Sequence, residues 1–343
     1  MLDDLKKITQ VDKSDALGVA EKQLEQLEWE FDVTIEPANE IKNIVLGGMG
    51  GSASYAEIYR VWPGSSLPFE IVRDYNLPKY VDSNTLYIAS SFSGNTEEAI
   101  EALSQAEERG CSIAVIAAGG KLGEIASNKG YPFAKLDHNI PQPRMSAFNS
   151  LKALLTVLEA AGVEQGKVAE LMEAGSSIGK VTQNWRAEVP TSQNEAKQIA
   201  LELMGRSVVA YSGRKMFPVA NKLKINANEN AKNVAWVNTF SEQNHNEFIG
   251  WSSHPIDKPY AIVNIMSSFE HPRIEKRFEV QDRLLSGRRP QPVRVDMVGD
   301  TLLTQLLYGL LLMDMATLYL AVLNNVDPTP VDLVEKMKVE LDK

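Results

Sequence analysis

The sequence predicts an α/β protein made of two flavodoxin-like, doubly wound domains, each with a parallel sheet flanked by helices. Three observations predict this class. Apolar runs of strand length alternate with helical patterns from about residue 43, which is typical of a parallel sheet covered on both faces. The alternation begins again in the second half of the chain. Two strands of the first half end in loops rich in glycine and serine, at the end of the sheet where such folds bind ligands.

Four segments are expected along the chain. The N-terminal helical segment contains one helix over residues 14–32, which Ser14 caps and in which leucines recur at helical spacing. The expected segments are 1–40 (N-terminal helical segment), 41–162 (first domain), 163–195 (helical connector) and 196–343 (second domain with C-terminal helices).

The first domain is expected to alternate short buried strands with amphipathic helices. The predicted strands are Asn43–Leu46, Phe69–Val72, Thr85–Ala89, Ser112–Ala117 and Tyr131–Leu136. The predicted helices are Ala53–Val61, Glu97–Arg109, Lys121–Lys129 and Met145–Ala161.

The second domain repeats this pattern less regularly. Its predicted strands are Ser207–Tyr211, Ala261–Met266 and Val293–Val298, and its predicted helices are Arg214–Ala231, Pro272–Leu285 and Thr301–Asn324. The last helix is very apolar, but its longest uncharged stretch has 13 residues before Asp314. That stretch is too short to span a bilayer, so we expect a buried helix.

Composition limits the classes of partner. The formal net charge of −10 repels nucleic acids and anionic membranes, and neither is expected as a partner. The single cysteine, Cys111, excludes an intramolecular disulfide and suits a reducing cytoplasm. We expect it to be a buried structural thiol. The N-terminal residues lack the apolar core of a signal peptide.

Two loops have the composition of anion-binding turns. They are Gly47-Gly48-Met49-Gly50-Gly51-Ser52 and Ser90-Ser91-Phe92-Ser93-Gly94-Asn95-Thr96. A strand, a tight turn and a helix start together direct several backbone N–H groups at one point, and the helix dipole favours an anion there. The second loop adds four hydroxyl groups, which suits the oxygens of a phosphate monoester. The sequence therefore predicts a small phosphorylated ligand.

Two other interpretations compete with this one. Gly48-x-Gly50-x-x-Ala53, with Glu70 20 residues after Gly50, fits a permissive dinucleotide fingerprint. A second anion loop and the hydroxyl of Ser52 favour a phosphomonoester instead. The segment Ser93-Gly94-Asn95-Thr96 could also be a simple turn with Thr96 as the N-cap of a helix, which leaves Ser90, Ser91 and Ser93 unexplained.

Arg144 supports the phosphate interpretation. It stands near the expected N-terminus of the helix at Met145, after two prolines, where the helix dipole disfavours a cation. A phosphate between the helix end and the guanidinium would remove that conflict. The alternative is a surface ion pair with Asp137.

The second domain contains a modified version of the serine-rich loop. Ser267-Ser268-Phe269 follows its strand as Ser90-Ser91-Phe92 follows the earlier one, but Glu270-His271-Pro272 replaces Ser93-Gly94-Asn95. Glycine and two hydroxyl positions are lost and a carboxylate is gained. We therefore expect phosphate binding only in the first domain.

These residues resemble those of the sugar isomerase (SIS) domain proteins, and more closely those of the bifunctional phosphoglucose/phosphomannose isomerases. The resemblance spans residues 40–340 and rests on five elements. They are Ser91-x-Ser93-Gly94-x-Thr96, Gly50-Gly51-Ser52, Asn228-Glu229-Asn230, His245-Asn246-Glu247 and Asp327-Pro328-Thr329-Pro330-Val331.

The resemblance implies two SIS domains and metal-independent isomerisation of hexose 6-phosphates. By analogy Glu229 moves a proton between C2 and C1 through an enediol. His245, from the partner subunit of a homodimer with its active site at the subunit interface, assists ring opening together with Lys338, for which Lys336 is a close alternative. The phosphate is held by Gly51, Ser52, Ser91, Ser93, Thr96 and Arg144, and Thr329 is linked to accepting mannose 6-phosphate as well as glucose 6-phosphate.

The residues alone support this chemistry only in part. Proton transfer needs a shielded carboxylate and ring opening needs a carrier that titrates near neutrality, and Glu229 and His245 are of those types. No metal and no other cofactor are expected, because the four histidines lack Cys or Glu partners at ligand spacing. The alternatives are a non-catalytic SIS regulator that binds a sugar phosphate, and another SIS enzyme such as an amino-sugar phosphate isomerase or deaminase.

Overall fold

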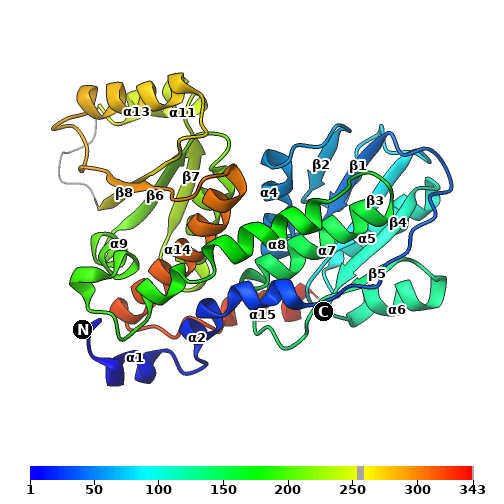
Figure 1. Ribbon diagram of the computed structural model, residues 1–343, viewed down its shortest axis with the longest axis horizontal. Helices are drawn as coiled ribbons and strands as arrows, with labels where there is room; N and C mark the ends of the chain where they lie inside the picture. Colours follow the sequence, from blue (N-terminus) through cyan, green and yellow to red (C-terminus); the bar gives the residue numbers. More distant parts are fainter. Residues whose placement is uncertain (253–258, 342–343) are drawn as a thin grey trace. The chain divides into compact units, whose positions relative to one another are not determined.

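The computed structural model describes residues 1–252 and 259–341, and Figure 1 shows its elements. The chain divides into two compact units. The N-sheet unit contains Lys22–Gly179 and Gly299–Leu307, and the C-sheet unit contains Met1–Glu21, Lys180–Val298 and Tyr308–Lys343. The first 21 residues thus group with the second half of the chain, whereas the sequence led us to expect a separate N-terminal segment.

The N-sheet unit is built on a parallel sheet of the doubly wound type. Its strand order is β2-β1-β3-β4-β5, the flavodoxin-like order, with a topological switch point between β1 and β3. This confirms the predicted fold class. The strands are β1 (Asn43–Gly47), β2 (Phe69–Val72), β3 (Thr85–Ser90), β4 (Ser112–Ala117) and β5 (Phe133–Lys135).

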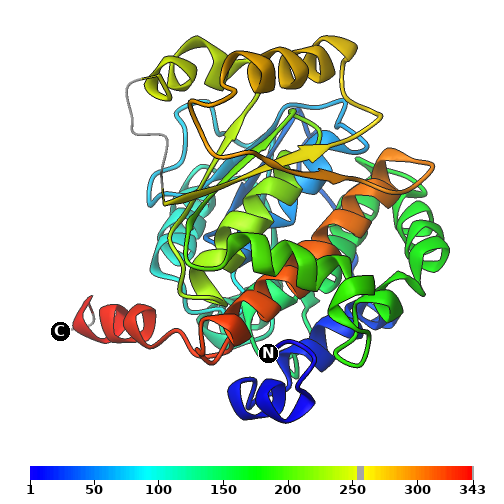
Figure 2. The ribbon, with the colours of Figure 1, turned by 90° about the vertical axis from the view of Figure 1, so that its left-hand side faces the viewer.

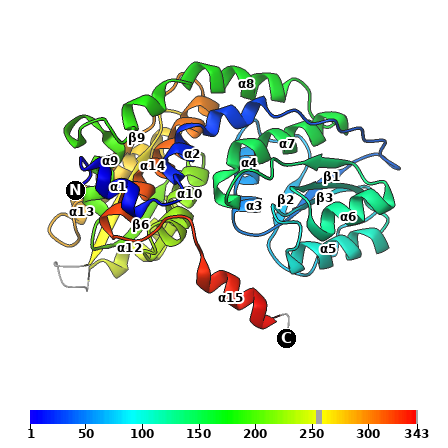
Figure 3. The same cartoon turned by 90° about the horizontal axis from the view of Figure 1, so that it is seen from below.

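Helices cover both faces of this sheet, as Figure 3 shows. Alternate side chains of a strand point to opposite faces. Val45, Tyr87 and Val115 pack with the alanine-rich sides of α5 and α6 on one face, while α4 and α7 lie on the other. The helices are α3 (Gly51–Ser54), α4 (Ala56–Val61), α5 (Glu97–Glu108), α6 (Gly120–Lys129), α7 (Ala147–Ala160) and α8 (Lys167–Ile178).

The N-terminal helices differ from the single helix expected over residues 14–32. The chain forms α1 (Leu5–Val11), α2 (Ala16–Glu21) and the 3-10 helix η1 (Gln23–Glu28). Ser14 does not begin the helix. Instead Asp12 accepts hydrogen bonds from the amides of Ala16 and Leu17, at 2.8 and 2.9 Å. Burial raises the pKa of this carboxyl group.

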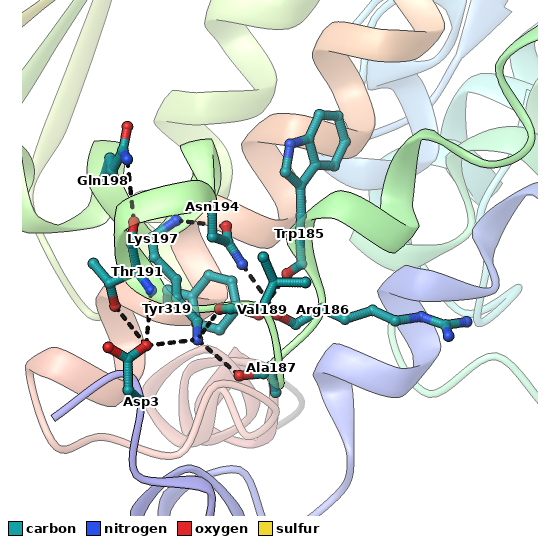
Figure 4. A network of polar contacts seen from close by, with 10 residues as sticks. All are labelled: Asp3, Trp185, Arg186, Ala187, Val189, Thr191, Asn194, Lys197, Gln198 and Tyr319. Carbon is teal, nitrogen blue, oxygen red and sulfur yellow. Dashed lines mark hydrogen bonds and ion pairs between the residues drawn. The ribbon is translucent and has the colours of Figure 1, made fainter.

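A buried lysine fastens α1 to the C-sheet unit (Figure 4). The side chain of Lys197 is fully buried, and its Nζ lies 3.2 Å from Asp3 Oδ1. The same Nζ donates to the carbonyl oxygens of Ala187 and Val189, at 2.7 and 2.8 Å. A buried charge needs such partners. The contact of Lys197 with Asp3 therefore links the N-terminal residues to this unit.

The C-sheet unit repeats the parallel pattern with fewer strands. The order is β7-β6-β8-β9, and Figure 2 shows α13 on one face of the sheet and α10 and α14 on the other. The strands are β6 (Ser207–Ser212), β7 (Ala235–Thr239), β8 (Tyr260–Met266) and β9 (Val293–Asp296). The helices include α9 (Glu195–Leu203), α10 (Phe217–Glu229), α11 (Glu242–His245), α12 (Glu247–Gly250), α13 (Pro272–Leu284), α14 (Leu302–Leu323) and α15 (Asp332–Leu341).

Helix α14 is a core helix. It is long and apolar enough to cross a membrane by length and composition, but its most apolar window is entirely buried inside the protein. Asp314, the charge that interrupts the apolar run, pairs with the buried Lys222 of α10 at 3.0 Å and accepts a hydrogen bond from Asn226 Nδ2.

Replacing Asp314 with asparagine is expected to destabilise the fold by about 3–5 kcal/mol, because the substitution removes the carboxylate that pairs with the buried ammonium group of Lys222. Urea unfolding measures the loss. The double variant Lys222→Met/Asp314→Leu removes both charges and is expected to be more stable than Asp314→Asn, although the loss of the acceptor of Asn226 Nδ2 still costs about 1–3 kcal/mol. A loss below about 1 kcal/mol for Asp314→Asn, as at an exposed pair, would contradict this.

Cys111 is half-buried, and its Sγ donates a hydrogen bond to the carbonyl oxygen of Asp82 at 3.3 Å. Burial raises the pKa of this thiol to about 11, which makes the reactive thiolate scarce at neutral pH.

Candidate active site

The two glycine- and serine-rich loops meet at one edge of the N-sheet. Strands β1 and β3 pair in parallel, with Gly47 opposite Ala89, so the loops that follow them leave the sheet side by side at the switch point. Hydrogen bonds join them directly. Ser52 Oγ accepts from the amide of Phe92 at 2.9 Å, and Ser90 Oγ donates to the carbonyl oxygen of Ser52 at 2.6 Å.

The hydroxyl groups of the second loop form a cluster. Ser91 Oγ lies 2.7 Å from Thr96 Oγ1 and 3.5 Å from Ser93 Oγ. Thr96 is the N-cap residue of α5, but its side chain makes no capping hydrogen bond. The Thr96 hydroxyl therefore belongs to the cluster, and the interpretation of this segment as a turn with a threonine cap does not hold.

A third loop, which contains Gly119 and Gly120, packs against the loop that carries this cluster. At Gly94, where φ is +72°, an added Cβ would lie 1.8 Å from the carbonyl oxygen of Gly119. At Gly120, where φ is +65°, it would lie 2.3 Å from the carbonyl oxygen of Ser93. Asn95 Oδ1 accepts a hydrogen bond from the amide of Lys121 at 3.0 Å, at the start of α6. The Gly119-Gly120 pair could have revealed this loop, since it follows a predicted strand.

Arg144 adjoins the first loop through its backbone. It lies in the 3-10 helix η2 (Pro143–Met145), and a Cβ on Gly51 would lie 2.8 Å from the Arg144 amide nitrogen. The residue is buried, with 2 % exposure, and does not lie at the surface as the alternative interpretation expected. The arginine thus lies in the interior, next to Gly51 and Ser52.

Glu229 and Thr329 belong to two segments of the C-sheet unit that Lys232 joins. Glu229 is the last residue of α10 and is half-buried. Lys232 Nζ donates to the carbonyl oxygens of Glu229 and Asp327, at 2.8 and 2.7 Å. Asp327 Oδ1 in turn accepts from the amide of Thr329 at 3.0 Å. Lys232, which the sequence analysis did not single out, therefore joins the end of α10 to the Asp327–Val331 segment.

The other candidates of this unit lie on exposed parts of helices. His245 is the last residue of α11 and is exposed. Lys338 and Lys336 are exposed on α15, where Lys338 pairs with Glu335 at 2.7 Å. Figures 1 and 2 show α11 and α15 well separated along the vertical direction of the views. The structure therefore does not bring α11 beside α15 within one chain.

The corresponding loops of the C-sheet unit are filled by a carboxylate. Glu270, which follows β8, accepts from the amide of Met216 at 3.0 Å. A Cβ on Gly213, which follows β6, would lie 2.4 Å from Glu270 Oε1. Burial raises the pKa of Glu270, although the amides of Met216 and Lys215 act in the opposite direction. Glu270 thus occupies the position at the edge of the C-sheet that corresponds to the hydroxyl cluster of the N-sheet unit.

The raised pKa of Glu270 predicts a pH-dependent stability. The folded protein favours the protonated carboxyl group, so this residue reduces stability as the pH rises from about 4, near the ordinary glutamate pKa, through the raised pKa. Glu270→Gln keeps the size and lacks the charge. We expect the wild type to lose stability relative to this variant between about pH 4 and pH 7, measured by urea unfolding at several pH values.

The matched control for this measurement is Glu279→Gln. Glu279 is exposed, and its hydrogen bond with Lys276 lowers its pKa, so its contribution has the opposite sign. A stability difference between the wild type and Glu270→Gln that does not vary with pH would contradict the assignment.

Of the remaining histidines, His254 lies outside the described residues, and His138 and His271 are not part of a metal site. His138 is exposed, and exposed His271 accepts a hydrogen bond from the amide of Arg273 at 3.1 Å. Within residues 1–252 and 259–341, no group of three His, Cys, Asp or Glu side chains could hold a metal ion.

Comparison with known proteins defines the class first. The chain is similar to the crystal structure of a glucose-6-phosphate isomerase-like protein from Thermus thermophilus, with a TM-score of 0.63 and 18% identity over 98% of both chains. A sequence model described as the bacterial phospho-glucose isomerase C-terminal SIS domain matches residues 192–341. The fold and this match define a protein of the SIS-domain class.

Sequence relatives then identify the family. The bifunctional phosphoglucose/phosphomannose isomerase of Caldicellulosiruptor bescii is 33% identical over 89% of this chain and 91% of its own length. The protein of the same name from Aquifex aeolicus is 30% identical over 93% of this chain and 95% of its own length. The chain belongs to the bifunctional phosphoglucose/phosphomannose isomerase family, as its motifs suggested.

Proposed function

We propose that this protein interconverts fructose 6-phosphate with glucose 6-phosphate and with mannose 6-phosphate, by moving a proton between C2 and C1 through an enediol. Family membership supports the reaction. The observation that carries the substrate class is the pair of loops at the switch point of the N-sheet, where amides and hydroxyl groups converge. No metal takes part in the proposed chemistry.

The phosphate is proposed to bind at the N-sheet edge. The amide of Gly51 and the hydroxyl groups of Ser52, Ser91, Ser93 and Thr96 donate hydrogen bonds to its oxygens. The start of α5, a helix of 12 residues, places its positive dipole end at the same loop. Arg144, buried beside Gly51, offers a guanidinium that can contact two phosphate oxygens at once.

Proton transfer is assigned to Glu229. A carboxylate positioned at C1 and C2 can remove a proton from one carbon and return it to the other, and a positioned acid–base group typically contributes about 10²- to 10⁴-fold to the rate. Thr329, held near Glu229 through Lys232 and Asp327, is proposed to influence whether the manno epimer is accepted.

Ring opening is assigned to His245 and Lys338, with Lys336 as the alternative lysine. The exposure of His245 at the end of α11 supports its action outside its own unit. We propose a homodimer in which each histidine reaches the site of the partner subunit. We propose that the protein acts in the cytoplasm, whose reducing environment suits a single cysteine.

The test is incubation of the pure protein with fructose 6-phosphate and a chelator, with both aldose phosphates measured. Formation of both products supports the proposal. Formation of glucose 6-phosphate alone contradicts the dual specificity. Binding without turnover would favour a regulator that binds a sugar phosphate, and turnover of glucosamine 6-phosphate alone would favour an amino-sugar enzyme.

A further inference from the structure

The turn that carries His245 is held by its neighbours in the sequence. Helix α11 ends at His245 and α12 begins at Glu247. Between them Asn246 has φ −138° and ψ −63°, which breaks the helical path. An exposed side chain at such a break takes its direction from the residues that fix the backbone on either side.

Glu247 fixes the turn on one side. Its Oε1 accepts a hydrogen bond from the hydroxyl group of Tyr211, and its Oε2 accepts one from Asn238 Nδ2 at 2.8 Å. Tyr211 and Asn238 lie opposite each other in the register of β6 and β7. Both carboxylate oxygens are therefore bound to the end of the sheet, on two adjacent strands.

The donors to Glu247 are themselves held in place. Tyr211 is fully buried, and its hydroxyl group accepts a hydrogen bond from Trp251 Nε1 at 3.2 Å. Arg289 is also buried and interacts electrostatically with both Tyr211 and Glu247. Its guanidinium pairs with Asp282 at 2.5 Å. The hydrogen bond from Trp251 therefore helps to hold the Tyr211 hydroxyl group that donates to Glu247.

Asn244 fixes the turn on the other side. Its Nδ2 donates to Gln281 Oε1 at 2.6 Å, and its Oδ1 accepts from Arg277 Nη1 at 3.1 Å. Both partners lie on α13. His245 therefore stands between an anchor to α13 and an anchor to the sheet. Each anchor includes a charged group, the carboxylate of Glu247 at the sheet and the guanidinium of Arg277 on α13.

We propose that Glu247 is a positioning residue of the isomerase. By accepting hydrogen bonds from Tyr211 and Asn238, it sets the direction in which the side chain of His245 projects from the C-sheet unit. The inference rests on the proposed function, in which His245 assists ring opening. Glu247 itself contacts no substrate in this proposal and acts through the histidine.

The experiment compares Glu247→Ala, Tyr211→Phe and His245→Asn, singly and with the double variant Glu247→Ala/His245→Asn. We expect Glu247→Ala to lower kcat for fructose 6-phosphate by about tenfold to a hundredfold, the effect of misplacing a catalytic group by about 1 Å. The KM should stay within about twofold, because the phosphate loops belong to the other unit. In the His245→Asn background, Glu247→Ala should cost nothing further.

Tyr211→Phe keeps the buried ring and removes one donor, so it tests the anchor if Glu247→Ala folds poorly. It should lower kcat with KM unchanged. Glu279→Ala, an exposed glutamate on α13, is the control and should retain wild-type kinetics. Thermal unfolding of every variant separates positioning from loss of folded protein.

The outcomes separate the inference from the proposed function. If His245→Asn is inactive while Glu247→Ala and Tyr211→Phe keep wild-type kcat, the inference fails and the proposed role of His245 stands. If the losses of Glu247→Ala and His245→Asn multiply in the double variant, Glu247 does not act through His245. If His245→Asn is fully active, the role of the histidine and the inference both fail.

Discussion

Replacing Glu229 with glutamine is expected to abolish exchange of the C2 hydrogen of the substrate with solvent. Glutamine fills nearly the same volume at the end of α10 but cannot accept and return the proton. We expect kcat to fall by at least about 10²- to 10⁴-fold, with little change in KM because the phosphate loops are intact. Incubation of glucose 6-phosphate in deuterated water, followed by mass spectrometry, measures the exchange.

The control for Glu229→Gln is Glu202→Gln, at an exposed position of α9, which should exchange at the wild-type rate. Retained exchange in the Glu229 variant would show that another group is the base. Since Lys232 contacts the backbone carbonyl of Glu229, this substitution leaves the join to the Asp327–Val331 segment in place.

Replacing Gly51 with alanine is expected to lower kcat/KM by about a hundredfold, mainly through KM. The new Cβ would lie 2.8 Å from the amide nitrogen of Arg144 and 2.9 Å from the carbonyl carbon of Pro143. Both are backbone atoms, so the arginine turn and the Ser52 loop must separate. A displacement of about 1 Å between two binding groups has an effect of this order.

The control for Gly51→Ala is Gly119→Ala at the same edge of the sheet, because nothing lies within 4 Å of a Cβ built on Gly119. Binding is also measured without catalysis, as the rise in melting temperature that inorganic phosphate produces. An unchanged phosphate response in Gly51→Ala would show that Arg144 and the Ser52 loop do not share a ligand.

The strands of the N-sheet could be predicted from the sequence because each is a short apolar run between turn residues. The structure places all five within a few residues of the predicted ranges. Strand β7 was missed because only its first residue is buried; an edge strand of this kind lacks the apolar run that reveals a central strand. The predicted helix over Ala53–Val61 is divided at Tyr55 into α3 and α4.

The anion-binding loops of the candidate site could be predicted from local sequence, whereas the acid–base residues could not. Glycines and hydroxyl groups that directly follow strands are enough to predict an anion-binding loop. In the structure, hydrogen bonds join the two predicted loops. Glu229 and His245 have no such local signature, because one glutamate in a helix resembles any other. Their roles stay predictions that rest on the family. The hydrogen bonds of Lys232 and Glu247 join segments that lie apart in the sequence, and no local pattern reveals such contacts.

The contact of Gly94 and Gly120 with neighbouring backbone has a consequence for the thermodynamics of ligand capture. Segments in such close backbone contact are expected to move together, so we expect the serine-rich loop to be ordered before the proposed phosphate ligand binds. Little conformational entropy is then spent on binding. Calorimetric titration with phosphate esters should therefore show a small entropic penalty, and the loop should exchange its amide hydrogens slowly both with and without ligand.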